Sequence, residues 1–321
     1  MRRIKKCTVF LLLLCLLLNL PAGAAAQKPL RVTLVLKTVT EVAEFWGTLL
    51  SGVEKAAEEY GVELKVLTSP REIDIDKQIE LIRQVTADKP DVMILSAADY
   101  DRCAEATEEA IAAGIGVVAI DTDVNAAGRA CFVGSNSYEI GLEMGRAMAS
   151  YLPEGGKVAV IQHMLTTTTG IERTRGVLDA LNEAGNIEIL GSFCCDNSTE
   201  QAQTITTELL SADPEIRGFV CTNEVCNVGA ANALVELGMG GRVYVVGCDN
   251  SQRQIQFLEQ NIIQAIVTQR PFNMGYVAVQ QAVRVANGEQ TDDFVEVSCV
   301  LITRENMYTQ ENQKLLFPVL R

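Results

Sequence analysis

The sequence predicts an α/β protein made of two doubly wound lobes, each a parallel sheet covered by helices on both faces. Short apolar runs rich in β-branched residues alternate with helical segments from Arg31 almost to the end of the 321-residue chain. Such runs are typical of buried parallel strands, and strict strand–helix alternation favours doubly wound sheets. The length suits two domains of ordinary size, and no Pro/Gly/Ser-rich linker separates them.

The first series of elements is expected before residue 121. Strands are expected at residues 31–37, 62–67, 91–95 and 117–120, and helices at 45–60, 74–87 and 101–113. In the first helix the apolar positions Leu49, Val53 and Ala57 recur with helical spacing, which predicts one buried face. Gly61 follows at the position where a left-handed residue commonly ends a helix.

A second series follows a short strand expected at residues 130–133. Helices are expected at residues 139–151, 169–184, 200–212 and 230–237, and strands at 157–161, 187–191, 218–222, 242–247 and 265–268. Because the two series are alike and only short crossovers join them, we expect two similar lobes rather than two domains on a flexible linker.

Residues 1–26 are expected to be a signal peptide. Four basic residues precede an apolar stretch from Cys7 to Leu20, and small residues lead up to Ala26, after which we expect cleavage. The stretch is short for a membrane span, although an uncleaved anchor stays open. Cys15 lies deep inside it, which disfavours lipoprotein attachment. We therefore expect export to the periplasm or to the outer face of the cell envelope.

The mature chain is strongly acidic. Without the four basic residues of the signal, 23 Lys and Arg face 41 Asp and Glu, which is a formal charge of −18. This balance argues against nucleic acid and anionic lipid as partners. Many of the acids, such as Glu58 and Glu108, fall on expected helix surfaces, where solvation accounts for them.

Eight cysteines remain after cleavage, without any C-x-x-C pair, and His163 is the only histidine of the chain. No metal site is expected, because a zinc site would need thiolates at unusual spacings. Four cysteines in strand-like segments are expected in the core: Cys131, Cys221, Cys248 and Cys299. The adjacent Cys194 and Cys195 are the disulfide candidate.

Catalytic motifs are missing from the sequence. It contains no G-x-G-x-x-G after the first strand, no P-loop and no G-x-S-x-G. A single histidine disfavours a hydrolytic triad, and Asp74 with Asp76 is typical of a helix start rather than of a catalytic carboxylate pair. The sequence predicts neither an enzyme nor a cofactor.

Four of the apolar runs end on a polar side chain: Asp121, Asn223, Asp249 and Gln269. In open parallel sheets ligands bind beyond the carboxyl ends of the strands. These side chains therefore predict a site for a neutral, hydroxyl-rich molecule. The alternative is that they only cap strand-to-helix turns, where Asp and Asn are common.

Two aromatic residues and one arginine extend this pattern. Phe45 and Trp46 open the first long helix, and such rings stack on the C–H face of a sugar; packing against the sheet is the alternative for one of them. Arg173 lies near the start of a later helix and offers a planar fork for hydroxyls or a ring oxygen, with an ordinary surface position as the alternative.

Short segments in a fixed order carry a family resemblance. They are EFW at 44–46 with Gly52, DIDKQI at 74–79, GIGVVAID at 114–121, FVGSN at 132–136, ER at 172–173 with Gly176, TNE at 222–224, VGCD at 246–249 and QRPFNMGY at 269–276. Together they resemble the ribose- and galactose-type sugar-binding proteins of ABC importers, the type I periplasmic binding proteins. The resemblance runs from about residue 30 to beyond residue 302 and covers nearly the whole mature chain.

The resemblance implies two lobes that trap a ligand by closing about a hinge of three crossing strands. The lobes are expected to be residues 27–134 with 271–295, and residues 135–270 with 296–321. The ligand-binding residues that it implies are Phe45, Trp46, Ser96, Asp121, Arg173, Asn197, Asn223, Asp249 and Gln269.

The sequence departs from ribose binders at several of these positions. Thr122 replaces an arginine after the first acid, and Asn197 stands near the place of an aromatic that covers the sugar. Lys37 replaces a small hydroxyl residue, and Glu44 precedes the aromatics. Lys37, Glu44 and Thr122 are therefore further candidates for ligand contact. A larger, charged or phosphorylated solute and a furanose stay open as ligands.

The expected function is that of an exported receptor that binds a small sugar or polyol by lobe closure and delivers it to an ABC permease, with a monomer as the family default. A membrane sensor kinase is the alternative partner, because both partners would meet the same closed form. The effector domain of a transcription regulator is a further alternative, but such a chain would begin with a basic helix-turn-helix.

Overall fold

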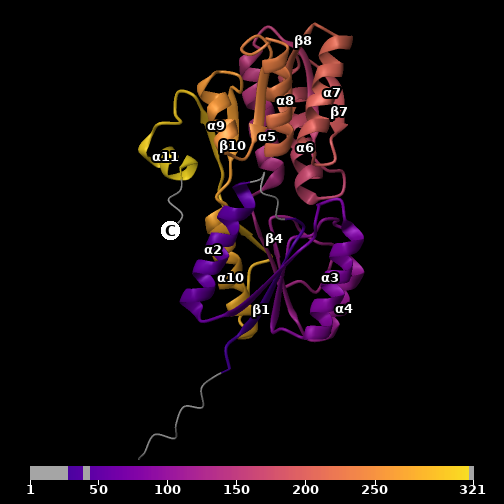
Figure 1. Cartoon of the computed structure of the whole chain (residues 1–321), viewed down its shortest axis with the longest axis vertical. Coiled ribbons are helices and arrows are strands. Elements are labelled where there is room, and N and C mark those ends of the chain that lie inside the picture. Colours follow the sequence, from indigo (N-terminus) through magenta and orange to yellow (C-terminus); the bar gives the residue numbers. More distant parts are fainter. Residues whose placement is uncertain (1–27, 39–43, 318–321) are drawn as a thin grey trace, which may run out of the picture.

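The computed structural model describes residues 28–38 and 44–317. They form two α/β lobes, one above the other along the long axis of the molecule (Figure 1). The expected signal peptide lies outside the described residues. Within them, no helix combines the length and the apolar character that a membrane crossing requires.

The sheet of the N-terminal lobe has the strand order β11-β5-β4-β3-β1-β2, and all its neighbours are parallel. The strands are β1 (Arg31–Leu36), β2 (Glu63–Thr68), β3 (Val92–Leu95), β4 (Gly116–Ile120), β5 (Cys131–Gly134) and β11 (Phe294–Glu296). The central strands are buried on both faces, which is why they read as unbroken apolar runs.

The sheet of the C-terminal lobe has the order β12-β10-β9-β8-β6-β7, in which only the edge strand β12 runs antiparallel, to β10. The strands are β6 (Gly156–Gln162), β7 (Ile187–Cys194), β8 (Ile216–Cys221), β9 (Tyr244–Cys248), β10 (Ala265–Thr268) and β12 (Val300–Thr303). The predicted fold class, two doubly wound lobes, is confirmed.

Helices cover both faces of each sheet (Figure 1). In the N-terminal lobe, α2 (Glu44–Tyr60) and α10 (Pro271–Ala286) share one face, and α3 (Ile75–Asp88) and α4 (Ala104–Ala112) the other. In the C-terminal lobe, α5 (Ser137–Tyr151) and α6 (Thr168–Ala184) lie opposite α7 (Thr199–Ala212), α8 (Glu224–Glu236) and α9 (Gln252–Glu259). The short α11 (Gln310–Leu316) flanks α9 (Figure 1).

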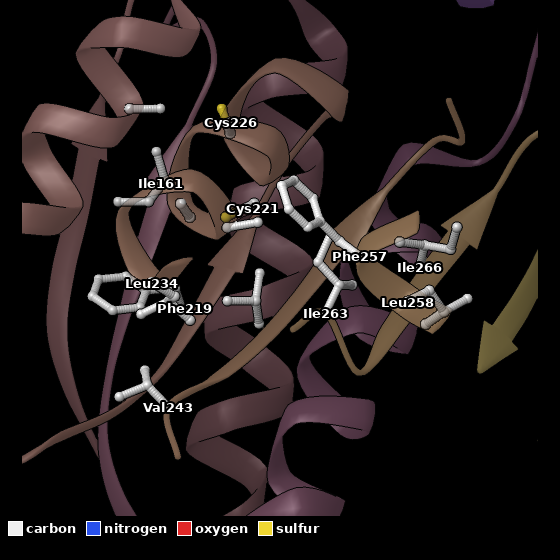
Figure 2. Packing of buried hydrophobic residues seen from close by; sticks show 14 of the residues in the cluster. Ile161, Phe219, Cys221, Cys226, Leu234, Val243, Phe257, Leu258, Ile263 and Ile266 are labelled. Atoms are coloured by element: carbon white, nitrogen blue, oxygen red, sulfur yellow. The ribbon is translucent and has the colours of Figure 1, made fainter. Parts of the chain in front are cut away.

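Each face therefore has its own apolar core. On the α8 face of the C-terminal lobe, Phe219 of β8 and Phe257 of α9 are the largest fully buried side chains (Figure 2). Cys221 and Cys226 lie in the same cluster. Cys131 and Cys248 are also buried as expected, whereas Cys299 is only partly buried.

The chain crosses between the lobes three times. The crossings lie between β5 and α5, between β10 and α10, and between β11 and β12. The Ser135 hydroxyl on the first crossing donates a 2.7 Å hydrogen bond to the carbonyl oxygen of Val297 on the third. Glu296, the last residue of β11, falls one position beyond the lobe boundary expected after residue 295.

One helix boundary differs from the sequence prediction in a way that matters for the site. The helix expected at 230–237 begins at Glu224, because the side-chain oxygen of Asn223 accepts a hydrogen bond from the Cys226 amide and caps the helix. By contrast, Gly61 has the predicted left-handed conformation, with φ of 66°.

Candidate binding site between the lobes

A cavity of about 50 Å³ lies between the two lobes, at the carboxyl ends of strands from both sheets. Most of the predicted site residues line it: Lys37, Phe45, Trp46, Asp121, Arg173, Asn197, Asn223, Asp249 and Gln269. Five lining residues were missed by the sequence-based prediction: Glu72, His163, Thr169, Glu224 and Val225.

Lys37 follows β1 and holds two carboxylates of the N-terminal lobe. Its Nζ lies 2.8 Å from Glu72 Oε1 and 3.3 Å from Asp121 Oδ2, and all three side chains are buried. Burial disfavours the charged ammonium, but the two carboxylates outweigh it and raise the pKa of Lys37. Lys37 therefore stays charged between the two carboxylates, at the wall of the cavity.

Asp121 and Asp249 occupy equivalent places in the two lobes. Each directly follows a central strand, and each has a left-handed backbone, with φ of 63° and 71°. This conformation is costly for residues other than glycine, although Asp tolerates it better than most. Both carboxylates line the cavity from these turns.

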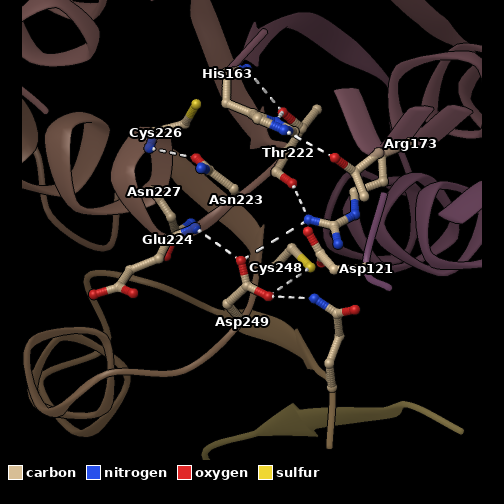
Figure 3. A network of polar contacts seen from close by, with 12 residues as sticks. Asp121, His163, Arg173, Thr222, Asn223, Glu224, Cys226, Asn227, Cys248 and Asp249 are labelled. Carbon is tan, nitrogen blue, oxygen red and sulfur yellow. Dashed lines mark hydrogen bonds and ion pairs between the residues drawn. The ribbon is translucent and has the colours of Figure 1, made fainter. Parts of the chain in front are cut away.

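A polar network spreads from Asp249 across the C-terminal lobe (Figure 3). Its Oδ1 accepts a 2.6 Å hydrogen bond from Gln269 Nε2, and its Oδ2 accepts one from the Glu224 amide at 3.2 Å. Arg173 Nη1 lies 3.9 Å from the same Oδ2 and donates to the Thr222 carbonyl oxygen at 2.9 Å. Strand ends and helix starts are thereby fixed around one carboxylate.

Arg173 is buried, with 3% of its surface exposed, and its Nε has no hydrogen-bond partner among the described atoms. Its place depends on close packing of α5 against α6: a Cβ at Gly141 would lie 2.2 Å from the Arg173 carbonyl oxygen. The surface position considered from the sequence is wrong. A buried donor on a cavity wall is an expected feature of a site for polar ligands.

His163 follows β6 and is held between two hydroxyls. Its Nδ1 lies 2.7 Å from Thr222 Oγ1, and its Nε2 lies 3.2 Å from Thr169 Oγ1. Burial lowers its pKa well below the usual value, and the positive charges of Arg173 and Lys37 lower it further. The ring is therefore a neutral part of the wall.

Asn197 connects the two lobes at the wall of the cavity. Its Nδ2 donates to Glu72 Oε2 at 2.8 Å, and its Oδ1 accepts from Asn223 Nδ2 at 2.8 Å. Asn197 has a left-handed φ of 54° and follows Asp196, with φ of 49°. Two such residues in succession form a costly turn that this pair of hydrogen bonds holds in place.

Glu224 is a buried acid whose Oε2 has no hydrogen-bond partner among the described atoms. Burial, followed by the negative charges of Asp249 and Glu44, raises its pKa to about 8, although the nearby Ser251 hydroxyl offsets part of the rise. At neutral pH the side chain is therefore mostly protonated. The wall thus holds a neutral carboxylic acid that can donate a hydrogen bond.

The aromatic side of the cavity comes from the start of α2. The rings of Phe45 and Trp46 meet edge to face, with centroids 5.1 Å apart. The Nζ of Lys37 lies 5.6 Å from the centre of the Trp46 ring. Trp46 is buried and belongs to the apolar core, so the packing alternative applies to this ring, whereas stacking on a sugar stays a prediction.

Three candidates do not line the cavity. Ser96 and Thr122 are fully buried beneath it, where their hydroxyls lie 3.1 Å apart and Thr122 donates to the Ala97 carbonyl oxygen. Glu44 is exposed, and its carboxylate accepts a 3.1 Å hydrogen bond from the Gln252 amide at the start of α9. It therefore joins the two lobes outside the cavity.

Other contacts join the lobes near the start of α6. The Tyr100 amide donates to the Thr166 carbonyl oxygen at 3.0 Å, and the Thr166 hydroxyl donates to the Ala98 carbonyl oxygen at 3.1 Å. The Asp123 amide donates to Thr168 Oγ1 at 3.1 Å. The two lobes are thus closed on each other around the cavity.

The cysteines are arranged differently from the prediction. Cys194 and Cys195 are not joined: the Cys194 thiol faces Asp196, whereas Cys195 Sγ lies 3.4 Å from Cys226 Sγ. Adjacent residues at the end of a strand point in opposite directions, so the predicted pair was wrong. Within residues 28–38 and 44–317, no cluster of His, Cys, Asp and Glu is suited to holding a metal ion.

Fold and site together define a two-lobed binding protein that encloses a small polar ligand at its hinge. Comparison with known families agrees with this class of protein: the sequence model of the family described as "Periplasmic binding protein domain" matches residues 33–290. The chain belongs to this family of periplasmic binding proteins.

Individual relatives cover most of the chain. The D-allose-binding periplasmic protein of Escherichia coli strain K12 is 26% identical over 303 residues, which is 90% of this chain and 96% of the relative. The D-ribose/D-allose-binding protein of Pseudomonas aeruginosa is also 26% identical, over 86% of this chain and 89% of the relative.

Solved structures agree in fold. A solute-binding protein of Actinobacillus succinogenes with bound D-allose has a TM-score of 0.80 and 26% identity, over 87% of this chain and 98% of that one. One from Agrobacterium radiobacter in complex with D-arabinose has a TM-score of 0.87 at 23% identity, over 91% of this chain and all of that one.

Proposed function

We propose that this chain is the solute-binding protein of an ABC importer and that it binds one small, neutral sugar or polyol between its lobes. The observation that carries the proposal is the set of buried donors and acceptors on both lobes, with aromatic rings on one side. Each ligand hydroxyl donates one hydrogen bond and accepts up to two, so it needs an acceptor and donors. An unsatisfied buried hydroxyl costs roughly 1–3 kcal/mol. The cavity walls supply both.

Charge favours a neutral ligand over a phosphorylated one. The buried cations Lys37 and Arg173 already lie near Glu72, Asp121 and Asp249, so the acids outnumber the bases. A phosphate group would add negative charge to this site and would lose its water without a cation left to replace it. Enclosure of the cavity by both lobes also favours a small ligand.

The relatives support the sugar class. The two curated relatives are named for D-allose and for D-ribose and D-allose, and the Actinobacillus succinogenes protein holds D-allose. They are named as binding and transport proteins, which supports a receptor without catalytic activity. Aldopentoses and aldohexoses are therefore the first ligands to test.

The same relatives favour delivery to a permease in the cell envelope. The family and the curated relatives are described as periplasmic or as binding proteins, which supports export and a permease partner. Nothing in these relatives supports a sensor kinase or a transcription regulator. We propose a monomer in which residues 27–134 with 271–295 close onto residues 135–270 with 296–321.

The test is a fluorescence titration of the mature protein. Trp46 is the only tryptophan of the chain and lines the cavity, so its emission reports on the site. We expect a saturable change with one or a few neutral aldoses and none with their phosphates. Saturable binding of sugar phosphates alone would overturn the neutral-ligand proposal, and silence with every sugar in a folded protein would overturn the sugar assignment.

A further inference from the structure

We propose that Cys195 and Cys226 form a disulfide in the mature protein. Their Sγ atoms lie 3.4 Å apart, and both side chains are fully buried in the C-terminal lobe. A disulfide joins sulfurs about 2.05 Å apart, so the two need to approach by roughly 1.4 Å. Among the described residues, this is the one pair of cysteine sulfurs within hydrogen-bonding distance of each other.

The two thiols are chemically unequal, which suits thiol–disulfide exchange. The hydrogen bond from the Cys226 thiol lowers the pKa of Cys195 despite its burial. Burial raises the pKa of Cys226 well above its usual value, and the sulfur of Cys195 raises it further. Cys195 is therefore the nucleophile, because the thiolate is the reactive form.

The oxidant is the exchangeable disulfide of a thiol–disulfide oxidoreductase or of a small molecule such as oxidised glutathione. The Cys195 thiolate attacks one of its sulfurs, a mixed disulfide forms and the first thiolate leaves. The Cys226 thiol then loses its proton and attacks Cys195 Sγ, and the second thiolate leaves. Two electrons pass to the oxidant, which becomes two thiols.

Burial places this reaction in folding. Neither sulfur is exposed once α8 covers its face of the sheet, so an external disulfide reaches Cys195 only in a partly folded lobe, in which the two sulfurs already meet and that face is still open. Cys194, next to Cys195, is partly exposed, but its thiol faces Asp196 and the His163 carbonyl oxygen. It does not compete for Cys226 in the folded lobe.

The disulfide would brace the cavity wall. Asn197 follows Cys195 by two residues, and the side chain of Asn223 caps the amide of Cys226 at 3.0 Å. These asparagines are the pair that meets at 2.8 Å on the wall. The covalent link would hold the left-handed turn at 196–197 against the start of α8. An effect of this link on ligand affinity rests on the proposed function, whereas formation of the disulfide does not.

The test uses the mature chain refolded from its reduced, denatured form in a mixture of reduced and oxidised glutathione. Alkylation in denaturant, followed by peptide mapping, should show six blocked cysteines of the eight and one linked peptide pair that joins Cys195 to Cys226. The Cys226→Ser variant should show seven blocked cysteines and no link, whereas Cys131→Ser should retain the link.

Eight blocked cysteines in the wild-type chain, or a link between other cysteines, would overturn the proposal. Melting supplies an independent readout: reduction should lower the Tm of the wild-type chain and of Cys131→Ser, but not that of Cys226→Ser. An equal fall in all three would also count against the disulfide. If no sugar binds, the peptide map still decides the disulfide, so the two proposals fail separately.

Discussion

Glu72 of the N-terminal lobe accepts a 2.8 Å hydrogen bond from Asn197 of the C-terminal lobe. The other carboxylate oxygen of Glu72 lies 2.8 Å from Lys37, so a continuous polar chain crosses the cavity edge from one sheet to the other. Closing the lobes therefore completes the coordination of a buried acid. This coupling makes Lys37 and Glu72 part of the closed state as well as of the wall.

Replacing Lys37 by Met should strongly destabilise the protein and abolish ligand binding. It leaves Glu72 and Asp121 buried without their cation, and such a loss costs about 3–5 kcal/mol. Urea unfolding followed by circular dichroism measures the effect. Lys55→Met is the matched control, because Lys55 lies half exposed on α2 of the same lobe and should change stability little. Equal losses in both variants would contradict the prediction.

Replacing Arg173 by Ala should lower ligand affinity roughly 10- to 100-fold, because it removes a buried donor with an unpartnered Nε from the cavity wall. Calorimetric titration with the sugar identified by fluorescence measures the loss. Arg175→Ala tests the same helix one half-turn away, at a side chain that is 57% exposed, and should leave affinity unchanged. An Arg173→Ala protein that binds as well as the wild type would remove Arg173 from the site.

Replacing Glu224 by Gln should flatten the pH dependence of stability. In the folded protein the pKa of Glu224 is about 8 instead of the ordinary 4.5, so its proton is retained after the unfolded chain has lost its own. The retained proton stabilises the folded protein. This contribution to the free energy of unfolding is complete below pH 4.5 and is lost as the pH rises through 8, at about 1.4 kcal/mol per pH unit. The variant should therefore gain stability relative to the wild type as the pH rises.

Urea unfolding of both proteins from pH 5 to pH 9 measures this difference. His163 is present in both proteins, so its contribution to the pH dependence of unfolding cancels. The difference between the two profiles therefore isolates Glu224. Glu236→Gln, at the exposed end of the same helix, is the control and should follow the wild-type profile. A Glu224→Gln profile parallel to that of the wild type would show that Glu224 has an ordinary pKa.

Replacing Gly52 by Ala should destabilise the N-terminal lobe. An added Cβ would lie 2.0 Å from the Phe272 carbonyl oxygen, so α2 and α10 would have to separate, at a cost of about 1–3 kcal/mol or more. Gly47→Ala, earlier on the same helix, meets no atom within 4 Å and should stabilise by about 0.5–1 kcal/mol. Unfolding curves of the two variants should therefore shift in opposite directions, and a shared direction would contradict this account.

Much of the site could be predicted because it follows from the topology. Asp121, Asn223, Asp249 and Gln269 each follow a buried strand, and the carboxyl ends of parallel strands converge on one edge. Glu72 escaped prediction because it lies in an irregular loop four residues after β2, where no periodic pattern marks it. The strand-end rule would have included Glu72 if it had covered the first four residues after each strand.

The sequence by itself determined the strands and most of the helices up to β10, the two-lobed class and the strand-end residues, because burial on both sheet faces and helical periodicity are written in the local pattern of apolar residues. It did not predict α9, α10, β11, β12 or α11. Only the tertiary structure decided which distant side chains meet. Cys195 and Cys226 are 31 positions apart, and Glu72 and Asn197 are 125 apart. Such pairings depend on how helices pack and how the lobes close, since these contacts leave no period in the chain. The fold also buries Glu224 near Asp249 and Glu44, and this environment, not the residue type, gives the wall its neutral acid.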